Sequence, residues 1–294
     1  MNTKPFLERI QQGEVLISDG ATGTNLQARG LQKGKPTEAW LFEHPEKIIQ
    51  LHMDFIEAGA DIILTNTFGA NPIRLEIGGM VVKAEEVNKT AVALARQAVG
   101  EKPIYIAGSI GPSGHLIKPF GPLDEEAVLE SYSTQAQALS EADIDLFVIE
   151  TQFDLNEARL ALKAVHSTSQ KPVVVSFSYD RGTRTMMGVR PSQMAKEFAD
   201  AGADLLGINC GRSLEDNITA LQELRQSTQL PLWFKPNAGL PRLDQNDQAI
   251  YDLIPEMMGE QTPLWIKLGA SVVGGCCGTS PEHLNHIAKA AKGV

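Results

Sequence analysis

Hydrophobic positions in this chain fall into eight short runs that alternate with longer amphipathic segments. Four runs share one design, in which the end of a helical pattern and an acidic or Gly-rich turn lead into apolar residues and then into polar ones. These four occupy residues 55–68, 139–153, 198–211 and 265–278. The remaining runs occupy residues 15–20, 104–109, 173–178 and 232–237. Short apolar runs bounded by turn residues are typical of buried β-strands, so the pattern predicts eight strands.

The segments between the runs have apolar residues at three- and four-residue spacing, which predicts amphipathic helices. Examples are residues 45–59, 84–100, 156–166 and 191–202, and several begin with Pro or an acidic turn and end at Gly. Alternating strands and helices predict a parallel sheet. Eight such units predict an α/β fold, a (β/α)8 TIM barrel forming a single domain over residues 1–294. An open doubly wound sheet is the alternative, but "DGATGTNLQ" lacks the spacing of a dinucleotide-binding loop.

The ends of the predicted strands carry polar residues at matching positions. When the four similar runs are aligned on their turns, Cys210 and Cys277 occupy one position, and Asn209 and Cys276 the position before it. In a barrel the carboxyl ends of all strands open on one face, where active sites lie. We therefore expect one face to hold Asp19, Asn66, Ser109, Glu150, Ser176, Asn209, Cys210, Asn237, Cys276 and Cys277. The Gly/Pro-rich segments 108–126 and 236–247 are expected to be active-site loops.

Composition and charge limit the partners and the cellular compartment that this protein is expected to have. The formal net charge of -10 and the pI near 5.1 argue against nucleic acid or an anionic membrane as partner. The N-terminus has no apolar signal-peptide core, and no apolar run approaches the ~20 residues of a membrane span. We therefore expect a soluble, cytoplasmic protein with reduced thiols. Three cysteines cannot all pair with one another, so reactive or metal-binding thiols are the alternatives to structural ones.

Three thiolates with one open position are typical of a catalytic zinc site that favours sulphur ligands. Zinc acidifies a thiol that takes the open position, and the resulting thiolate can accept an alkyl group by direct displacement. Each cysteine alone could instead be a buried structural residue. A disulfide between Cys276 and Cys277 is disfavoured, because adjacent residues close a strained ring.

The other polar strand ends suggest a thiol amino acid as substrate. Asp19 and Glu150 could bind an ammonium group, and the backbone N–H groups of residues 20–24 could hold a carboxylate. Asp19 could instead be a helix cap or turn former, and Glu150 could pair with a neighbouring Arg or Lys.

The motifs carried by these residues resemble those of the homocysteine S-methyltransferase family. They are "DGATGT", "TNTF", "GSIGPSG", "ETQFDLNEA", "GINC", "PNAGLP" and "GGCCGTSPEHL", in family order over almost the whole chain. The combination of "GINC" with a distant "GGCCGT" is the specific part of this signature. Within the family, the chain looks most similar to the homocysteine-binding modules of cobalamin-dependent methionine synthases.

The resemblance implies a TIM barrel in which Cys210, Cys276 and Cys277 hold zinc and homocysteine binds the metal through its sulphur. It also implies that Asp19 and Glu150 hold the amino group of homocysteine and that the backbone around Ala21 and Thr22 holds its carboxylate. Asn209 would shape the pocket, and Asn237 would fill the open zinc position when substrate is absent. The family commonly has Met where this chain has Thr22, which would alter the pocket near the methyl donor.

The function implied is zinc-dependent methyl transfer to the thiol of homocysteine, giving methionine. Because the chain ends soon after "GGCCGTSPEHL", the donor is expected to be methylcobalamin on a separate corrinoid protein, or a small methylated sulfonium or ammonium compound. The alternatives are a homocysteine- and zinc-binding barrel without independent catalysis, and a methyltransferase acting on another thiol. An aldolase-type lyase would need a Schiff-base lysine at a strand end, for which Lys235 is the candidate.

Overall fold

The computed structural model of this chain describes residues 4–243 and 249–293. Eight parallel strands form one sheet in the order β1-β10-β7-β6-β5-β4-β3-β2. They are β1 (Leu16–Ile17), β2 (Ile62–Leu64), β3 (Tyr105–Ile110), β4 (Leu146–Gln152), β5 (Val173–Phe177), β6 (Leu205–Cys210), β7 (Leu232–Pro236) and β10 (Ala270–Val273). Seven of them lie within one of the eight apolar runs, and β3 extends one residue past its run, so the predicted strands are confirmed.

The two ends of the sheet meet and close it into a barrel. Ser18, just after β1, forms a parallel bridge with Ile62 of β2. The N–H of Asp19 donates to the carbonyl of Ile62 at 3.0 Å, and the N–H of Asp61 donates to the carbonyl of Ile17 at 2.7 Å. The sequence-based prediction of a (β/α)8 barrel is therefore confirmed.

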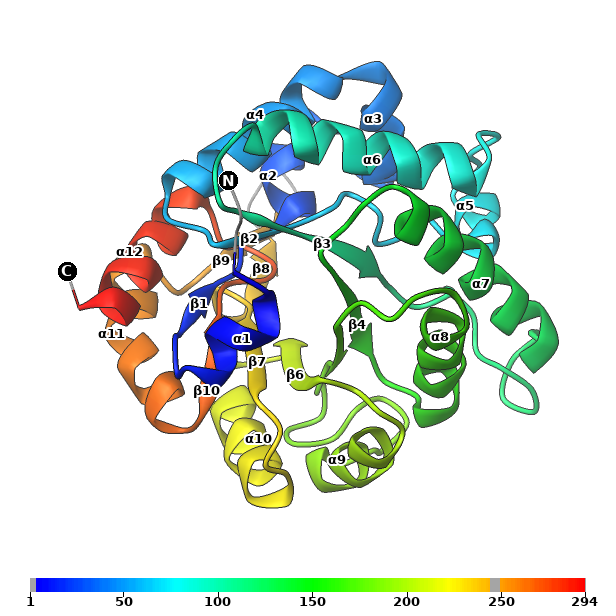
Figure 1. The fold of residues 1–294 in the computed structure, drawn as a ribbon. Helices are drawn as coiled ribbons and strands as arrows, with labels where there is room; N and C mark the ends of the chain where they lie inside the picture. The colour runs from blue at the N-terminus through cyan, green and yellow to red at the C-terminus, as the bar shows by residue number, and fades with distance from the viewer. Residues whose placement is uncertain (1–3, 244–248, 294) are drawn as a thin grey trace.

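One long helix follows each barrel strand and covers its outer face (Figure 1). These helices are α4 (Pro45–Glu57), α6 (Ala84–Val99), α7 (Glu125–Glu141), α8 (Leu155–Thr168), α9 (Pro191–Asp200), α10 (Leu214–Ser227), α11 (Pro255–Lys267) and α12 (Pro281–Lys292). Proline stands at the start of α4, α9, α11 and α12, where its missing N–H has no intrahelical partner to lose. The shorter helices α2 (Thr22–Ala28), α3 (Trp40–Glu43) and α5 (Pro72–Ile77) and the 3-10 turn η1 (Thr37–Ala39) lie in the connections after β1 and β2.

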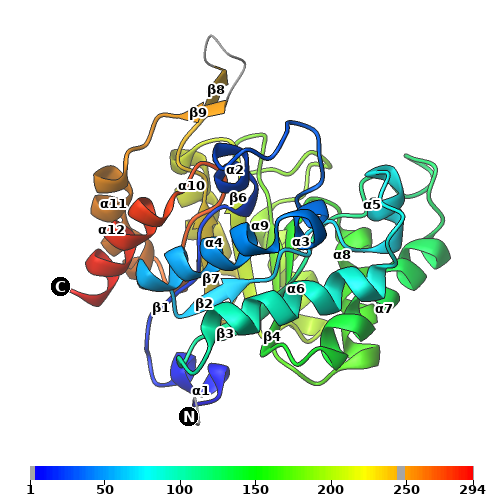
Figure 2. The same cartoon turned by 90° about the horizontal axis from the view of Figure 1, so that it is seen from above.

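Another short helix, α1 (Phe6–Gln11), lies across the amino-terminal end of the barrel (Figures 1 and 2). Its buried residues Phe6 and Ile10 pack on apolar side chains inside the barrel, among them Leu16 and Leu146. A second, larger apolar cluster fills the space between the sheet and the outer helices. The amino-terminal end of the barrel is thus closed by hydrophobic packing, which leaves the opposite end for the site.

The connections expected to be active-site loops follow β3 and β7 at the carboxyl end. The first runs from residue 111 to residue 124, between β3 and α7. The second begins at residue 237, directly after β7. It includes β8 (Pro241–Leu243), which pairs antiparallel with β9 (Ala249–Tyr251) in a hairpin that projects beyond the barrel (Figure 2). Residues 244–247 of that expected loop lie outside the described residues.

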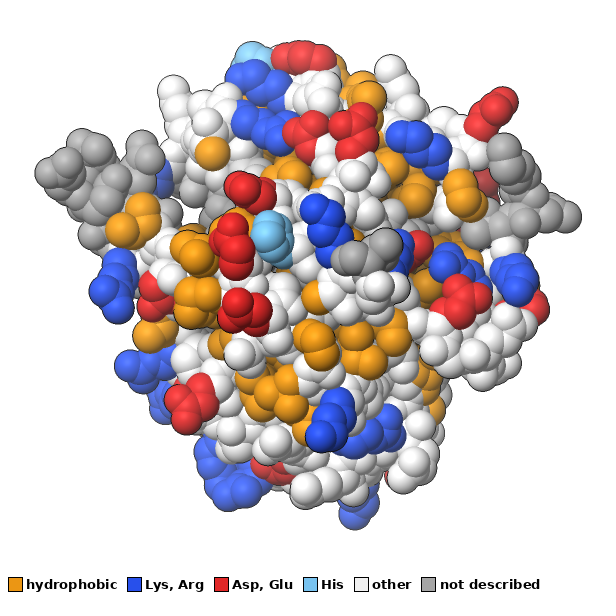
Figure 3. All heavy atoms as spheres, turned by 90° about the vertical axis from the view of Figure 1, so that its left-hand side faces the viewer, with side chains coloured by type: hydrophobic (Ala, Val, Ile, Leu, Met, Phe, Trp, Pro, Cys, Tyr) orange, Lys and Arg blue, Asp and Glu red, His pale blue; other side chains and the backbone are white. Residues whose placement is uncertain are grey.

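The outer surface carries both signs of charge. On the face formed by α11 and α12, acidic and basic side chains are interspersed with hydrophobic ones (Figure 3). Among the described residues, no helix is both long and apolar enough to cross a bilayer.

Candidate active site

The three cysteines, distant in sequence, meet at the carboxyl end of the barrel. Their sulphur atoms all lie within 4.8 Å of one another. Cys210 Sγ is 2.8 Å from Cys276 Sγ and 3.9 Å from Cys277 Sγ. All three residues are half-buried and none forms a disulfide. The convergence expected from the strand alignment is therefore observed, whereas a metal at this point stays a prediction.

Backbone geometry at the end of β6 presents Cys210 to this cluster. Cys210 has a φ of 57°, and Thr151, at the matching position of β4, has a φ of 59°. This left-handed conformation is uncommon for residues other than glycine and needs support from its surroundings. The carbonyl of Cys210 accepts a hydrogen bond from Asn217 Nδ2 at 2.6 Å. Gly211 follows because a side chain there would collide with Asn217.

Asn209 joins the ends of β4, β5 and β6. Its Oδ1 accepts hydrogen bonds from the N–H of Thr151 at 2.8 Å and from Ser176 Oγ at 2.7 Å. Its Nδ2 donates to Thr151 Oγ1 at 2.7 Å and approaches Cys276 Sγ at 3.9 Å. Asn209 is fully buried, and its hydrogen bonds tie these three strand ends together next to Cys276.

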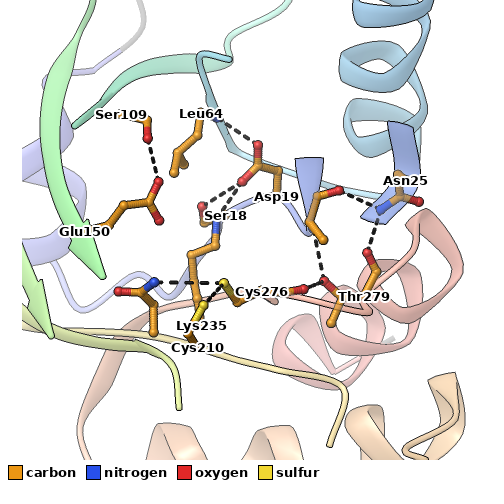
Figure 4. Close-up of polar contacts among 12 residues, drawn as sticks. Ser18, Asp19, Asn25, Leu64, Ser109, Glu150, Cys210, Lys235, Cys276 and Thr279 are labelled. Carbon is orange, nitrogen blue, oxygen red and sulfur yellow. Dashed lines mark hydrogen bonds and ion pairs between the residues drawn. The ribbon is translucent and has the colours of Figure 1, made fainter. Parts of the chain in front are cut away.

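The loop that carries Cys276 and Cys277 is fixed to both neighbouring strand ends. The N–H of Cys276 donates to the carbonyl of Pro236 at 2.8 Å, and the N–H of Ala238 donates to the carbonyl of Cys277 at 2.9 Å. Thr279 Oγ1 donates to the carbonyl of Cys276 at 2.6 Å and accepts from the N–H of Ala21 at 3.1 Å. The segment around Ala21 is therefore attached to the cysteine loop through Thr279, whose position next to Cys276 is shown in Figure 4.

The close thiols cannot all ionise on their own. The pKa of Cys277 is lowered because its thiolate would accept hydrogen bonds from Cys210 and Cys276. The pKa of Cys210 is raised well above its usual value by hydrogen bonds to the other two thiols and by burial. The pKa of Cys276 rises to about 12, because its hydrogen bond with Cys277 and its burial outweigh the lowering effect of Cys210. Three thiolates at this spacing need a cation to balance their charge. Three sulphur ligands are a donor set that zinc prefers.

Asn237, just after β7, fits the role of a further oxygen ligand. Its Nδ2 donates to the carbonyl of Gly211 at 2.8 Å, which turns the amide oxygen away from that carbonyl. That oxygen, Oδ1, is buried and has no hydrogen-bond partner. Buried polar atoms usually have a partner, and Asn237 lines the same pocket as Cys210, so this oxygen fits a ligand role beside that cysteine.

Asp19 and Glu150 lie on the same side of the cysteine cluster, and the side chain of Lys235 reaches toward Asp19 (Figure 4). Asp19 Oδ1 is 2.6 Å from Lys235 Nζ, and Asp19 Oδ2 accepts from the N–H of Leu64 at 2.8 Å. Glu150 Oε1 accepts from Ser109 Oγ at 2.6 Å. Burial raises the pKa of Glu150 to about 7, with the nearby Cys276 adding to the effect and Lys235 opposing it. The mouth of the barrel thus holds two carboxylates and one buried ammonium.

The expected carboxylate-binding segment begins helix α2. Ala21 is the N-cap and Thr22 the first helical residue. The N–H of Ala21 is already bonded to Thr279, so the N–H groups that follow it, from Thr22 onward, are the ones left for an anion.

Sequence reasoning missed two residues of this site. Lys235 was considered only as a Schiff-base candidate, yet it is an ion-paired residue. Although burial alone would lower the pKa of Lys235, Asp19 and Glu150 raise it, which keeps the amine protonated and disfavours a Schiff base.

The second residue, Tyr251 at the end of β9, was not considered. A side chain on Gly278 would collide with its ring, and burial together with the three cysteines raises its pKa.

A pocket of about 530 Å³ opens beside the cysteine cluster. Cys210 and Asn237 form part of its wall, Phe153 and Met186 contribute apolar surface, and Asp180 is among its charged residues. This volume lies in the range that holds small-molecule ligands. Cys210 is the one cysteine in the lining of this pocket, and neither Asp19 nor Glu150 is part of it.

The fold and site together define a (β/α)8 barrel with a thiol-rich centre at the carboxyl ends of its strands. The family model of homocysteine S-methyltransferase matches residues 16–291, and the chain belongs to this family.

Two individual proteins of known name are similar to this chain. Methionine synthase of Mycobacterium tuberculosis is 28% identical over 299 residues, which cover 95% of this chain and 25% of that protein. The chain thus spans about a quarter of the length of that relative. The metallated form of the homocysteine methyltransferase MmuM from Escherichia coli superposes with a TM-score of 0.82 at 26% identity, covering 97% of this chain and 99% of that one.

More distant barrels share only the fold. The 3-dehydroquinate dehydratase of Geobacillus kaustophilus superposes with a TM-score of 0.52 at 15% identity, covering 95% of this chain and 92% of that one.

Proposed function

We propose that this protein transfers a methyl group to the sulphur of homocysteine and so forms methionine. The observation that carries the proposal is the meeting of Cys210, Cys276 and Cys277 at the barrel mouth in a chain of the homocysteine S-methyltransferase family. We propose that these three residues hold Zn²⁺, with the amide oxygen of Asn237 as the further ligand in the substrate-free protein. When bound, Zn²⁺ would lower the pKa of a substrate thiol and make it a nucleophile at neutral pH.

The protein's own groups would orient the acceptor. The carboxylates at the barrel mouth, Asp19 and Glu150, would receive the ammonium of homocysteine, and the backbone N–H groups from Thr22 onward, next to the N-cap Ala21, would receive its carboxylate. Asn209 would hold the pocket wall against the sulphurs. In the transfer, the homocysteine sulphur forms a bond to the methyl carbon while the donor's bond to that carbon breaks and the donor keeps the electron pair. The thiol proton is lost before this step.

The methyl donor has two candidate sources. One is methylcobalamin carried by a separate corrinoid protein, and the other is a small sulfonium or ammonium compound. The pocket beside Cys210 and Asn237 favours the small compound, because its volume matches a small molecule and the aromatic ring of Phe153 forms part of its wall. The opposite charges of Asp180 and Arg212 in the lining offset each other. The reduced thiols of such a site suit a cytoplasmic setting.

The experiment is methionine formation by purified, zinc-loaded protein from homocysteine, with S-methylmethionine and methylcobalamin supplied in parallel. Turnover with S-methylmethionine would identify a self-sufficient enzyme. Turnover with methylcobalamin alone would identify one half of a two-protein system. Binding of homocysteine without product from any donor would favour a barrel that binds without catalysis. Turnover of a different thiol in preference to homocysteine would correct the acceptor.

A further inference from the structure

The hairpin of β8 and β9, which projects beyond the barrel (Figure 2), is attached to the loop that carries two of the cysteines. The N–H of Ala238 donates to the carbonyl of Cys277 at 2.9 Å, and the carbonyl of Ala238 accepts from the N–H of Leu253 at 3.0 Å. The carbonyl of Leu253 is 2.9 Å from His283 Nε2 of α12. The segment that follows β9 therefore lies beside the backbone of Cys277.

Within this arrangement, the ring of Tyr251 lies directly on Gly278. A Cβ atom on Gly278 would be 2.2 Å from Cγ of Tyr251, so a side chain larger than hydrogen has no room there. Gly278 also has a φ of 82°, in the left-handed region that favours glycine. Its N–H donates to Thr24 Oγ1 at 3.3 Å. The residue directly after Cys277 is thus held by both the hairpin and α2.

The other two cysteines are fixed by side chains from the body of the barrel. The carbonyl of Cys210 accepts from Asn217, which is 1% exposed. The carbonyl of Cys276 accepts from Thr279, which is fully buried. The carbonyl of Cys277 accepts from a backbone N–H instead, and the side chain packed on its neighbouring residue comes from the hairpin. Of the three thiols, this one depends most on a projecting segment.

The phenol of Tyr251 also lies close to the sulphurs. Burial raises its pKa, and the charges of the three cysteines, Cys277 first, raise it further. Tyr251 therefore stays a neutral phenol at physiological pH and adds no negative charge beside the thiols. At the other strand of the hairpin, Leu240 directly precedes β8 and lines the pocket beside Cys210. One hairpin thus contacts both the cysteine loop and the wall of that pocket.

We propose that Tyr251 is a positioning residue of the metal centre, whose ring holds the Cys277–Gly278 segment so that the Cys277 sulphur is directed toward the other two. The inference rests on the zinc site of the proposed function and adds to it a residue from outside the barrel. Because residues that orient metal ligands are part of a site's affinity, removing the ring should weaken the hold on the metal.

The test measures the dissociation constant for Zn²⁺ by competition with a chromogenic chelator. In Tyr251→Ala it should rise roughly 10- to 100-fold, as expected for loss of a residue that orients a ligand. In Tyr251→Phe, which keeps the ring, it should stay within about threefold of the wild type. A second readout is the thiolate-to-metal absorption of protein saturated with Co²⁺. This absorption should be weaker in Tyr251→Ala and unchanged in Tyr251→Phe, whereas a general loss of stability would not alter it in folded protein.

The matched control is Ile250→Ala. Ile250 precedes Tyr251 on β9, so its side chain points to the opposite face of the strand, and it is 51% exposed. This variant should bind Zn²⁺ like the wild type. Unchanged affinity in Tyr251→Ala, or an equal loss in Tyr251→Phe or Ile250→Ala, would overturn the inference.

The failure of the inference can be told apart from that of the proposed function. The metal measurements need no methyl donor, so they decide the role of Tyr251 even where the wild type forms no methionine. A wild-type protein that retains no Zn²⁺ would overturn the metal centre and the role of Tyr251 together.

Discussion

The two ends of the barrel are both buried, but they are built from opposite chemistry. At the amino-terminal end, α1 places Phe6 and Ile10 on Leu16 and other apolar side chains. At the carboxyl end, the buried residues include the charged Asp19 and Lys235. Burying apolar groups stabilises a fold, whereas burying charges costs free energy unless each has a partner. The comparison indicates that, of the two ends, the amino-terminal one adds to stability and the carboxyl one holds the chemistry.

The largest expected effect is at the carboxyl end. Replacing Cys210 by Ala should remove zinc and turnover together, because two sulphurs remain where three are needed. The loss of activity should exceed the roughly 10- to 100-fold that a changed outer-shell partner costs. Metal analysis and methionine formation on the same sample test this. A Cys210→Ala variant free of metal but normal in turnover would rule out the zinc mechanism.

The next effect concerns the cost of the buried charges. Lys235→Met leaves the carboxylate of Asp19 buried without its cation, so the free energy of unfolding should fall by about 3–5 kcal/mol. Asp19→Asn/Lys235→Met should recover most of this loss, because neither charge then remains. Urea denaturation of the three proteins measures the difference. Equal losses in the single and double variants would show that the pair does not compensate.

At the amino-terminal end, a cavity should reduce stability without touching the chemistry. Leu146 is fully buried inside the barrel, so Leu146→Ala should lower the free energy of unfolding by about 2–5 kcal/mol. Zinc content and kcat of the folded protein should stay at wild-type values. A drop in kcat under conditions where the variant is fully folded would mean that the two ends are coupled.

Homocysteine binding at the carboxyl end should depend on pH through the protonation of Glu150. The pKa of Glu150 is raised to about 7, so its carboxylate is mainly charged above that pH and mainly neutral below it. Binding of homocysteine should therefore weaken as the pH falls through about 7. In the metal-free protein, the raised pKa also means that Glu150 favours folding at low pH and that this contribution is lost as the pH rises from about 4.5 toward 7. Calorimetric titrations and denaturation across this range should show both trends, and neither should persist in Glu150→Gln.

The smallest effect is expected at Ser109. Its hydroxyl donates to Glu150 Oε1, and Ser109→Ala removes a single neutral donor to this carboxylate. KM for homocysteine should rise roughly threefold to tenfold, with kcat little changed. Steady-state kinetics measure this split. A change confined to kcat would show that Ser109 does not act through the bound substrate.

The sequence predicted the barrel and the meeting of the thiols well, because both follow from regular patterns. Burial on both faces makes each parallel strand a short apolar run, and the shared position of Cys210 and Thr151 is matched by their shared left-handed backbone. The pairing of Lys235 with Asp19 joins residues 216 positions apart, and no local pattern shows that a lysine turns inward. Tyr251 was missed because it lies beyond the expected loop of residues 236–247, on a strand of three residues that is too short to show a pattern.

The central claim is that three cysteines hold a zinc ion. Asn237 is its fourth ligand in the substrate-free protein, and the sulphur of homocysteine replaces Asn237 when substrate binds. X-ray absorption at the zinc edge, with and without homocysteine, tests it most directly. We expect three sulphur ligands and one oxygen or nitrogen ligand in the free protein, and four sulphur ligands after homocysteine is added. A protein that retains no zinc, or a sulphur count unchanged by saturating homocysteine, would contradict the account.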